Sequence, residues 1–377
     1  MSKTYPVHEV DEDRLRQELR LVLVPGVGPL IRQRLVAQFG SVERVLAAGS
    51  GELQGVSGVG PTLAKRIVEA RDNVDVDEQL EIARANNVQI LLDSHADYPP
   101  LLKEIHDPPS VLFVRGTLLP GDQLAVAIVG TRHATRYGLK QAATLAASLA
   151  RSGITVVSGM ARGIDGAAHR AALEAGGRTI AVLASGVLEP YPPENVELAE
   201  QITGQGCLVS EAAPTMPPIS GMFPQRNRII SGLTLGTIVV EAADRSGALI
   251  TARHAWEQNR EVFAVPGPID SRLSQGSHRL IRDGAKLVSS IDDVLEELGP
   301  LAHETRRDDG TTVRVPAEVT LNEVEQKVLQ AIDPKGSLID DITQSSGLPV
   351  HRVLSTIHVL EMRGLIRRVS GNRVARI

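Results

Sequence analysis

Cysteine and aromatic residues are scarce in this sequence. Cys207 is the only cysteine among 377 residues, which excludes an intramolecular disulfide framework and a zinc site built from cysteine ligands. Cys207 begins a short apolar stretch, so we expect it to be a small buried side chain. Phe, Tyr and Trp together make up 2% of the residues, so any surface that stacks rings must use very few of them.

Long hydrophobic runs and a net positive charge are also missing. No apolar run reaches the ~18 residues that a membrane span requires, and the acidic residues 9–13 are unlike a secretory signal. These features predict a protein of the reducing cytoplasm with no membrane partner. The formal net charge is −5, so binding to a polyanion would require local clusters of basic residues.

The common cofactor motifs are absent. The chain has no G-x-x-x-x-G-K-[ST] sequence, and the turn from Gly130 to Gly138 lacks the G-x-G-x-x-G pattern of a dinucleotide site. We therefore expect no cofactor. Asp165 and His169 are four residues apart on an expected helix and could share a metal, but no third ligand is evident. The simpler interpretation is a helix-capping Asp165 and a partly exposed His169, with no metal.

The length of the chain predicts two or three domains. Residues 1–90 are expected to form an all-helical domain with tandem helix-hairpin-helix motifs, since residues 24–29 (VPGVGP) and 56–61 (VSGVGP) are similar turns that each lead into a helix. Such turns can bring backbone N–H groups to a phosphate. However, residues 1–86 hold 11 Lys/Arg and 13 Asp/Glu, which favours a compact bundle whose glycines only make turns.

Residues 95–298 are expected to form one domain, in which residues 124–298 alternate short apolar strands with helices. This alternation is typical of a parallel sheet covered on both faces, and right-handed crossovers then produce a Rossmann-like, doubly wound α/β fold. A further strand at 111–116 is expected to join the edge of this sheet. The main strands are expected at residues 124–129, 154–157, 179–183, 207–209, 237–240 and 261–264.

The end of the chain has the pattern of a winged helix. Residues 299–318 form a polar linker, and residues 319–377 contain three expected helices (323–332, 338–344 and 350–363) followed by two short strands. Residues 361–377 hold five Arg and one acid, so this tail could make secondary contacts with nucleic acid. The residues proposed for these contacts are Arg367, Arg368, Arg373 and Arg376.

Arginines and small residues recur at the expected ends of the strands in residues 95–298. Ligands of doubly wound sheets bind outside the carboxyl ends of the strands. The turn at Gly130 is followed by Arg132, Arg136 and Lys140, which are spaced along one face of the next helix. Glycine turns and arginines together favour binding of a phosphate chain.

Several longer motifs carry a family resemblance. They are residues 158–169 (SGMARGIDGAAH), 191–195 (YPPEN), 223–232 (FPQRNRIISG), 246–252 (SGALITA) and 264–267 (AVPG). Over residues 95–290 the chain resembles the DprA/Smf family of DNA-processing proteins. The resemblance implies a protein without enzymatic turnover that binds single-stranded DNA during natural transformation, protects it, helps to load the recombinase RecA and acts as a homodimer.

The resemblance also assigns roles to residues. The family's Gly-Ser/Thr-Arg motif falls on residues 130–132, so Arg132 is the main expected DNA contact. Arg178 fills the place of a basic residue before the third strand, and Phe223 either stacks on a base or belongs to the core. The full set of residues expected to bind single-stranded DNA is Gly130, Thr131, Arg132, Arg136, Ser158, Gly159, Arg162, Gly163, Arg178, Phe223, Arg226, Asn227 and Arg228.

Two alternative functions follow from other features of the sequence. Residues 236–241 (GTIVVE) partly resemble the acid-bearing strand of Rossmann-like enzymes that hydrolyse nucleoside phosphates. Glu241 would then be a general base, or it could equally be a buried acid that hydrogen-bonds a neighbouring loop. Ser158 and Ser185 lie outside a G-x-S-x-G elbow, so neither is a candidate nucleophile. The other alternative is a transcription-type regulator whose winged helix binds a specific duplex.

Overall fold

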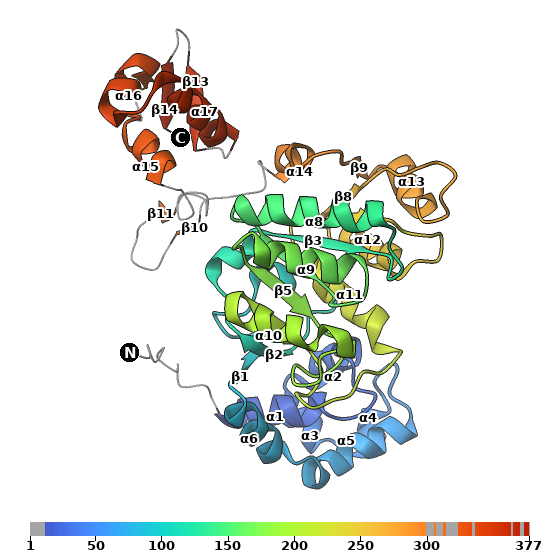
Figure 1. Ribbon diagram of the computed structural model, residues 1–377. Helices are drawn as coiled ribbons and strands as arrows, with labels where there is room; N and C mark the ends of the chain where they lie inside the picture. The colour runs from blue at the N-terminus through green and yellow to red at the C-terminus, as the bar shows by residue number, and fades with distance from the viewer. Residues whose placement is uncertain are drawn as a thin grey trace.

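The computed structural model describes residues 12–298, 305–306, 312–313, 323–333, 336–362, 365–369 and 373–376. Its centre is a nine-stranded sheet in the order β1-β2-β6-β5-β4-β3-β7-β8-β9 (Figure 1). The seven strands from β6 to β9 in that order pair in parallel, whereas β1–β2 and β2–β6 are antiparallel. This confirms the Rossmann-like, doubly wound fold.

The strands coincide closely with the apolar runs of the sequence. They are β1 (Val88–Leu92), β2 (Val111–Gly116), β3 (Ala125–Gly130), β4 (Thr155–Ser158), β5 (Thr179–Val182), β6 (Cys207–Ser210), β7 (Gly236–Val240), β8 (Glu261–Ala264) and β9 (Lys286–Leu287). Cys207 is fully buried in β6, as expected. The strand at 111–116 joins the parallel strands at their β6 edge, as expected, and β1, which was not anticipated, pairs with its outer side.

Helices cover both faces of the sheet. One face carries α8 (Arg136–Arg151), α9 (Ile164–Glu174), α10 (Val196–Gln205) and α14 (Ile291–Leu298), and the other carries α7 (Pro100–Lys103), α11 (Met222–Gly232), α12 (Gly247–Glu257) and α13 (Gln275–Arg282) (Figure 1). Strand β3 shows why both layers are needed. Val126 and Ile128 pack into one core, and Ala125, Ala127 and Val129 pack into the other. Two short 3₁₀ turns, η1 (Pro120–Gln123) and η2 (Pro193–Asn195), complete this domain.

The N-terminal domain contains the expected pair of helical hairpins. Its helices are α1 (Glu12–Val22), α2 (Pro29–Phe39), α3 (Val42–Ala47), α4 (Ser50–Leu53), α5 (Pro61–Asn73) and α6 (Val76–Ala85). The two hairpin turns hold each other in place. Arg34 on α2 donates to the Ser57 carbonyl oxygen (3.1 Å), and Arg66 on α5 donates to the Pro25 carbonyl oxygen (3.2 Å). These reciprocal bonds join the two hairpins.

The C-terminal residues form a winged helix, as the sequence predicts. It comprises α15 (Glu323–Gln330), β12 (Ser337–Leu338), α16 (Ile339–Ser346), α17 (Val350–Met362), β13 (Ile366–Val369) and β14 (Arg373–Arg376). The sheet has the order β12-β14-β13. Strand β12 was not anticipated, because Leu338 was assigned to the following helix. Within the predicted linker, β10 (Thr305–Arg306) and β11 (Thr312–Val313) pair antiparallel.

Two features bear on the other expectations. In the part of the chain that the structure describes, no helix is long and apolar enough to cross a membrane. Strand β1 belongs to the central sheet, although residues 88–90 fall inside the segment 1–90 that the sequence assigns to the helical domain. The helices of that domain end with α6, at Ala85.

Candidate functional site

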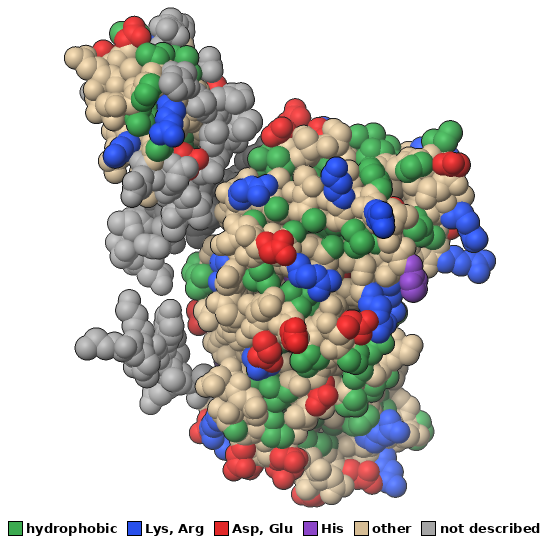
Figure 2. Space-filling view, viewed as in Figure 1, with side chains coloured by type: hydrophobic (Ala, Val, Ile, Leu, Met, Phe, Trp, Pro, Cys, Tyr) green, Lys and Arg blue, Asp and Glu red, His purple; other side chains and the backbone are tan. Residues whose placement is uncertain are grey.

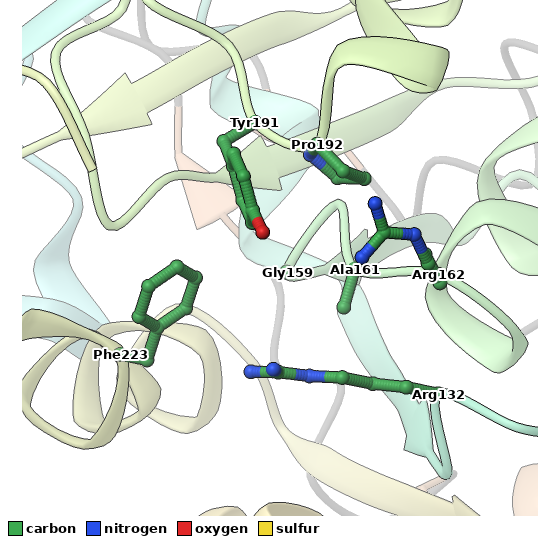
Figure 3. A pocket seen from close by; sticks show the side chains of 7 residues that line it. All are labelled: Arg132, Gly159, Ala161, Arg162, Tyr191, Pro192 and Phe223. Atoms are coloured by element: carbon green, nitrogen blue, oxygen red, sulfur yellow. The ribbon is translucent and has the colours of Figure 1, made fainter. Parts of the chain in front are cut away.

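A pocket opens where β3 and β4 end. It is lined by Arg132, Gly159, Ala161, Arg162, Tyr191, Pro192 and Phe223, and it encloses about 250 Å³ of empty space including open solvent (Figure 3). Figure 2 shows Lys and Arg side chains on the same side of the molecule, near α13 and the start of α8. The pocket therefore lies in the crevice at the strand ends, where ligands of such sheets bind.

Two glycines allow the loops of the pocket to approach each other. Gly163 has a left-handed φ of +75°, and a Cβ there would collide with the Thr131 carbonyl oxygen. A Cβ on Gly130 would collide with the Val240 carbonyl oxygen and Ile164. The amide of Ile164 also donates to Thr131 O (3.3 Å). Residues 130–132 and 158–163 thus form a single surface only because these two positions lack a side chain.

Arg132 is an exposed cation of the pocket that no carboxylate engages among the described residues. Its Cζ lies 5.3 Å from the centre of the Phe223 ring, a cation–π contact, and no ion pair involves Arg132 within the described residues. The ring of Tyr191 meets Phe223 edge-on, with centroids 5.8 Å apart and an interplanar angle of 69°. The structure therefore brings together Arg132 and Phe223, which the sequence predicted, and adds Tyr191, which it missed. The YPPEN motif was the available signal for Tyr191.

Arg162 also lines the pocket, but it is engaged by a carboxylate. Its Nε contacts Glu194 Oε1, and its Nη2 donates to Glu194 Oε2 (3.0 Å). The Glu194 carboxylate, and to a lesser extent Tyr191, raise the pKa of the Arg162 guanidinium. Arg162 therefore keeps its positive charge, but Glu194 neutralises it in this arrangement.

Arg226 lies beneath the floor of the pocket. Its side chain is buried and donates from Nη1 to the Val182 carbonyl oxygen, and the absence of a Cβ at Gly159 leaves room for its guanidinium. Burial lowers the pKa of Arg226 to about 10; Asp165 opposes this shift and Arg132 adds to it. Arg226 is therefore still protonated at neutral pH, and it places a second positive charge close to Arg132.

The backbone of the glycine loop is already occupied by an internal acceptor. The N–H groups of Gly159 and Ala161 both donate to Asp165 Oδ2 (3.2 Å each). Asp165 is buried, and this burial raises the pKa of its carboxyl group. These two N–H groups therefore hold Asp165 and are not available to a phosphate. The exposed side chains remain the groups that can reach a ligand.

His169 does not form a metal site with Asp165. The expectation of a partly exposed His169 is wrong: the side chain is fully buried where α9 packs on the sheet, with Nδ1 2.7 Å from Thr179 Oγ1. Burial lowers the pKa of His169 to about 3. No group of three His, Cys, Asp or Glu suited to a metal ion occurs among the described residues.

Besides Arg226, two more of the expected DNA-binding arginines are tied into the protein. Arg178 precedes β5 and so lies at the opposite edge of the sheet from the pocket, where it donates to both oxygens of Asp122 (2.8 Å each). Arg228 is buried and bridges Asp107 (2.9 Å) and Glu211 (2.7 Å). The structure does not bring either arginine into the pocket.

The other expected residues are divided between support and surface. Ser158 is buried and donates to the Ile128 carbonyl oxygen (2.6 Å), and Asn227 donates to the Gly247 carbonyl oxygen (3.3 Å). Arg136 is exposed in the first turn of α8, close along the chain to Arg132. Arg136 is therefore a further exposed cation on the segment that follows Arg132.

Glu241 holds a loop and does not line the pocket. It has a left-handed φ of +51°, and its carboxylate accepts hydrogen bonds from the backbone N–H (2.9 Å) and the hydroxyl of Thr135. The backbone N–H of Thr131 donates to its carbonyl oxygen (2.8 Å). The second of the two interpretations of Glu241, a buried acid that hydrogen-bonds a neighbouring loop, is confirmed. This acid fixes the segment that presents Arg132.

The arginines of the winged helix lie on its two longer strands. In the backbone register of β13 and β14, Arg367 pairs with Ala375 and Arg368 with Val374. Arg373 is exposed and Arg376 is half-buried. These four residues belong to a different domain from the pocket.

The fold and the pocket define a protein with a Rossmann-like core, a basic pocket at its strand ends, a helix-hairpin-helix domain and a winged helix. Three family models match this division: DNA recombination-mediator protein A over residues 89–299, the DprA winged helix domain over 313–372, and a SAM-like helix-hairpin-helix tandem over 18–73. The chain belongs to the DprA/Smf family of DNA-processing proteins.

Individual relatives agree with this assignment. The chain is 36% identical to protein Smf of Synechocystis over 94% of this chain and 96% of the relative. It is 41% identical to protein Smf of Escherichia coli over 74% of each chain. Among solved structures, DprA of Streptococcus pneumoniae superposes with a TM-score of 0.64 at 37% identity, over 75% of this chain and 97% of the other. DprA of Helicobacter pylori, described with a single-stranded DNA binding mode, has a TM-score of 0.52 at 30% identity, over 57% and 97%.

Proposed function

We propose that this protein binds single-stranded DNA, largely without sequence preference, in the pocket at the ends of β3 and β4. The observation that carries the proposal is Arg132, an exposed cation that rests on the Phe223 ring. An arginine beside an aromatic ring offers the two contacts that a single strand needs, one for a phosphate and one for an unpaired base. The single-strand binding described for the Helicobacter pylori relative supports the same ligand.

The charges around the pocket favour the phosphate chain of the strand. The guanidinium of Arg132 donates to a phosphate, and the buried charge of Arg226 reinforces the positive potential at that point. Arg136, in the first turn of α8, provides a further positive charge for the next phosphates of the strand. Because these contacts are made to phosphates, they carry no sequence information, and binding should weaken steeply as salt rises.

The dimensions of the pocket favour a single strand over a duplex. It is a shallow site between the loops that follow β3 and β4, so it offers side-chain contacts to one strand and has no room for a paired helix. A base would contact the exposed part of Phe223 or Tyr191, which form an edge-on pair at the mouth. No contact favours the nucleotide-hydrolase alternative, since Glu241 bonds Thr135 instead of lining the pocket.

The wider role follows from the family. We place this protein in the cytoplasm, where it would protect single-stranded DNA during natural transformation and help to load RecA, without catalysing a reaction. A homodimer belongs to the same proposal. Strand β9 supports it, because β9 is the last strand of the sheet among the described residues and Leu287 on it is 44% exposed.

The test is a titration of labelled single-stranded and duplex DNA at two salt concentrations, read by fluorescence anisotropy. Arg132→Ala should weaken single-strand binding by about 30-fold or more, which corresponds to ~2 kcal/mol for a charged hydrogen bond and its ring contact. Arg151→Ala is the matched control, since Arg151 is exposed at the far end of α8. Equal affinities for the two variants would refute the assignment of the pocket.

A further inference from the structure

The two arginines that line the pocket differ in their partners. Arg132 has no ion pair in the described part of the chain, whereas Arg162 is bound by Glu194 through two contacts, Nε to Oε1 and Nη2 to Oε2. This paired geometry is the one in which arginine binds either a carboxylate or a phosphate. Glu194 therefore occupies the donors with which Arg162 would hold a phosphate.

The position of Glu194 is fixed by its neighbours rather than by Arg162. Glu194 lies in η2, between Pro192, which lines the pocket, and Asn195. Asn195 is buried and donates from Nδ2 to the Met160 carbonyl oxygen (2.9 Å), which ties η2 to the loop that carries Arg162. The backbone that carries Glu194 thus stays beside the pocket even when the ion pair opens.

The ion pair itself is accessible. The side chain of Arg162 is 46% exposed and that of Glu194 is 50% exposed. Exposed ion pairs of this kind contribute little to stability, because water and salt screen them. An incoming anion can therefore replace the carboxylate without unfolding the loop or leaving a buried charge.

We propose that Glu194 occupies, in the free protein, the place on Arg162 that a backbone phosphate of the single strand takes in the complex. This inference rests on the proposed function and adds a second phosphate contact next to Arg132. A strand already held by Arg132 presents its next phosphate at a high local concentration and displaces Glu194. A separate small anion has no such advantage, so Glu194 makes Arg162 selective for a continuous phosphate chain.

The experiment is a double-mutant cycle on the full chain. Glu194→Gln keeps the shape of the side chain but removes its charge, and Arg162→Gln removes the guanidinium; the double variant completes the cycle. Glu197→Gln is the matched control, because Glu197 is also exposed, lies three residues further along in α10 and makes no ion pair among the described residues. Affinity for a labelled oligothymidylate is measured by anisotropy over a range of salt concentrations.

The proposal predicts that Glu194→Gln tightens binding by about three- to tenfold at low salt, from the loss of one opposing charge beside the phosphate. The slope of log K against log salt should become steeper by about 0.7, because the phosphate on Arg162 then releases its condensed cation and no freed Glu194 carboxylate takes one up. Glu197→Gln should change affinity by less than about twofold, since screened charges away from the contact have little effect. In the Arg162→Gln background, Glu194→Gln should have no larger effect than Glu197→Gln.

Three results would overturn the proposal: Glu194→Gln weakens binding, it matches Glu197→Gln, or its effect persists without Arg162. Weaker binding would mean that Glu194 orients Arg162 for the strand. Unfolding midpoints of all variants show whether the fold is retained. Failure of the proposed function is a different result, because the wild-type protein would then bind no single-stranded DNA at all.

Discussion

Replacing the buried His169 should remove a large part of the acid sensitivity of the central domain. His169 is fully buried between α9 and the sheet, and burial lowers its pKa to about 3, far below the ~6.5 of a histidine in an unfolded chain. The folded state therefore takes up no proton on His169 until about pH 3, whereas the unfolded state takes up one near pH 6.5. The stability from this group is fully present above pH 6.5 and is lost as the pH falls towards 3.

The size of the effect follows from the two pKa values. One proton taken up only by the unfolded state costs about 1.4 kcal/mol for each pH unit below 6.5, so the loss between pH 7 and pH 5 is ~2 kcal/mol. With a urea dependence of about 2 kcal/mol per molar, the midpoint of unfolding should fall by about 1 M from this group alone.

The measurement compares the wild-type protein with His169→Asn. The Asn amide can replace the Nδ1 donor that faces Thr179 Oγ1, but it does not titrate. Urea unfolding is followed at pH 7, 6 and 5 by the fluorescence of Trp256, the only tryptophan, which lies on α12 in the same domain. His169→Asn should be less stable at pH 7, and its stability should fall less as the pH is lowered. If both proteins lose the same stability between pH 7 and 5, His169 is not buried in its neutral form.

Two further predictions separate the residues that build the domain from those that we propose to bind DNA. Arg178→Ala should lower the free energy of unfolding by roughly 2 kcal/mol, since it leaves the buried Asp122 without its cation. Under conditions where the variant is fully folded, its affinity for single-stranded DNA should equal that of the wild type. A tenfold loss of affinity would instead show that Arg178 contacts DNA, as the family resemblance implies. Phe223→Leu should weaken single-strand binding by about three- to tenfold, because the ring contacts to Arg132 and to a base are lost. Phe223→Trp keeps a ring and should retain binding. If the Leu variant and the wild type have equal affinities in the anisotropy titration, Phe223 belongs to the core alone.

The fold was largely predictable because apolar periodicity reports burial directly. Strand β3 and its neighbours are short runs with apolar side chains on both faces. Such strands are typical of a sheet that helices cover on both sides. Strand β1 was missed for a physical reason. Residues 88–92 follow a helix directly, and their pairing with β2 depends on a contact made by folding rather than on a local pattern. Strand β12, with two residues, is too short to produce any period.

The site was less predictable, because the sequence shows where an arginine lies but not what surrounds it. Arg178 could have been excluded from the pocket, since a residue before a parallel strand lies at the opposite edge from residues that follow strands. The partners of Arg228, in contrast, come from residues 107 and 211, and no local pattern connects them. The aromatic pair of Tyr191 and Phe223 likewise joins two loops that meet only in the folded protein.

The negative net charge of the chain is compatible with a function in nucleic-acid binding. Several arginines of the central domain are matched by carboxylates: Arg178 by Asp122, Arg228 by Asp107 and Glu211, and Arg162 by Glu194. Asp122, Asp107 and Glu211 lower the net charge at places that do not line the pocket, and Arg132 has no ion pair among the described residues. Removal of an acid should thus strengthen DNA binding only where the acid competes with a phosphate. Glu194 meets that condition at an exposed arginine, whereas Asp122 is buried and its loss would cost stability instead.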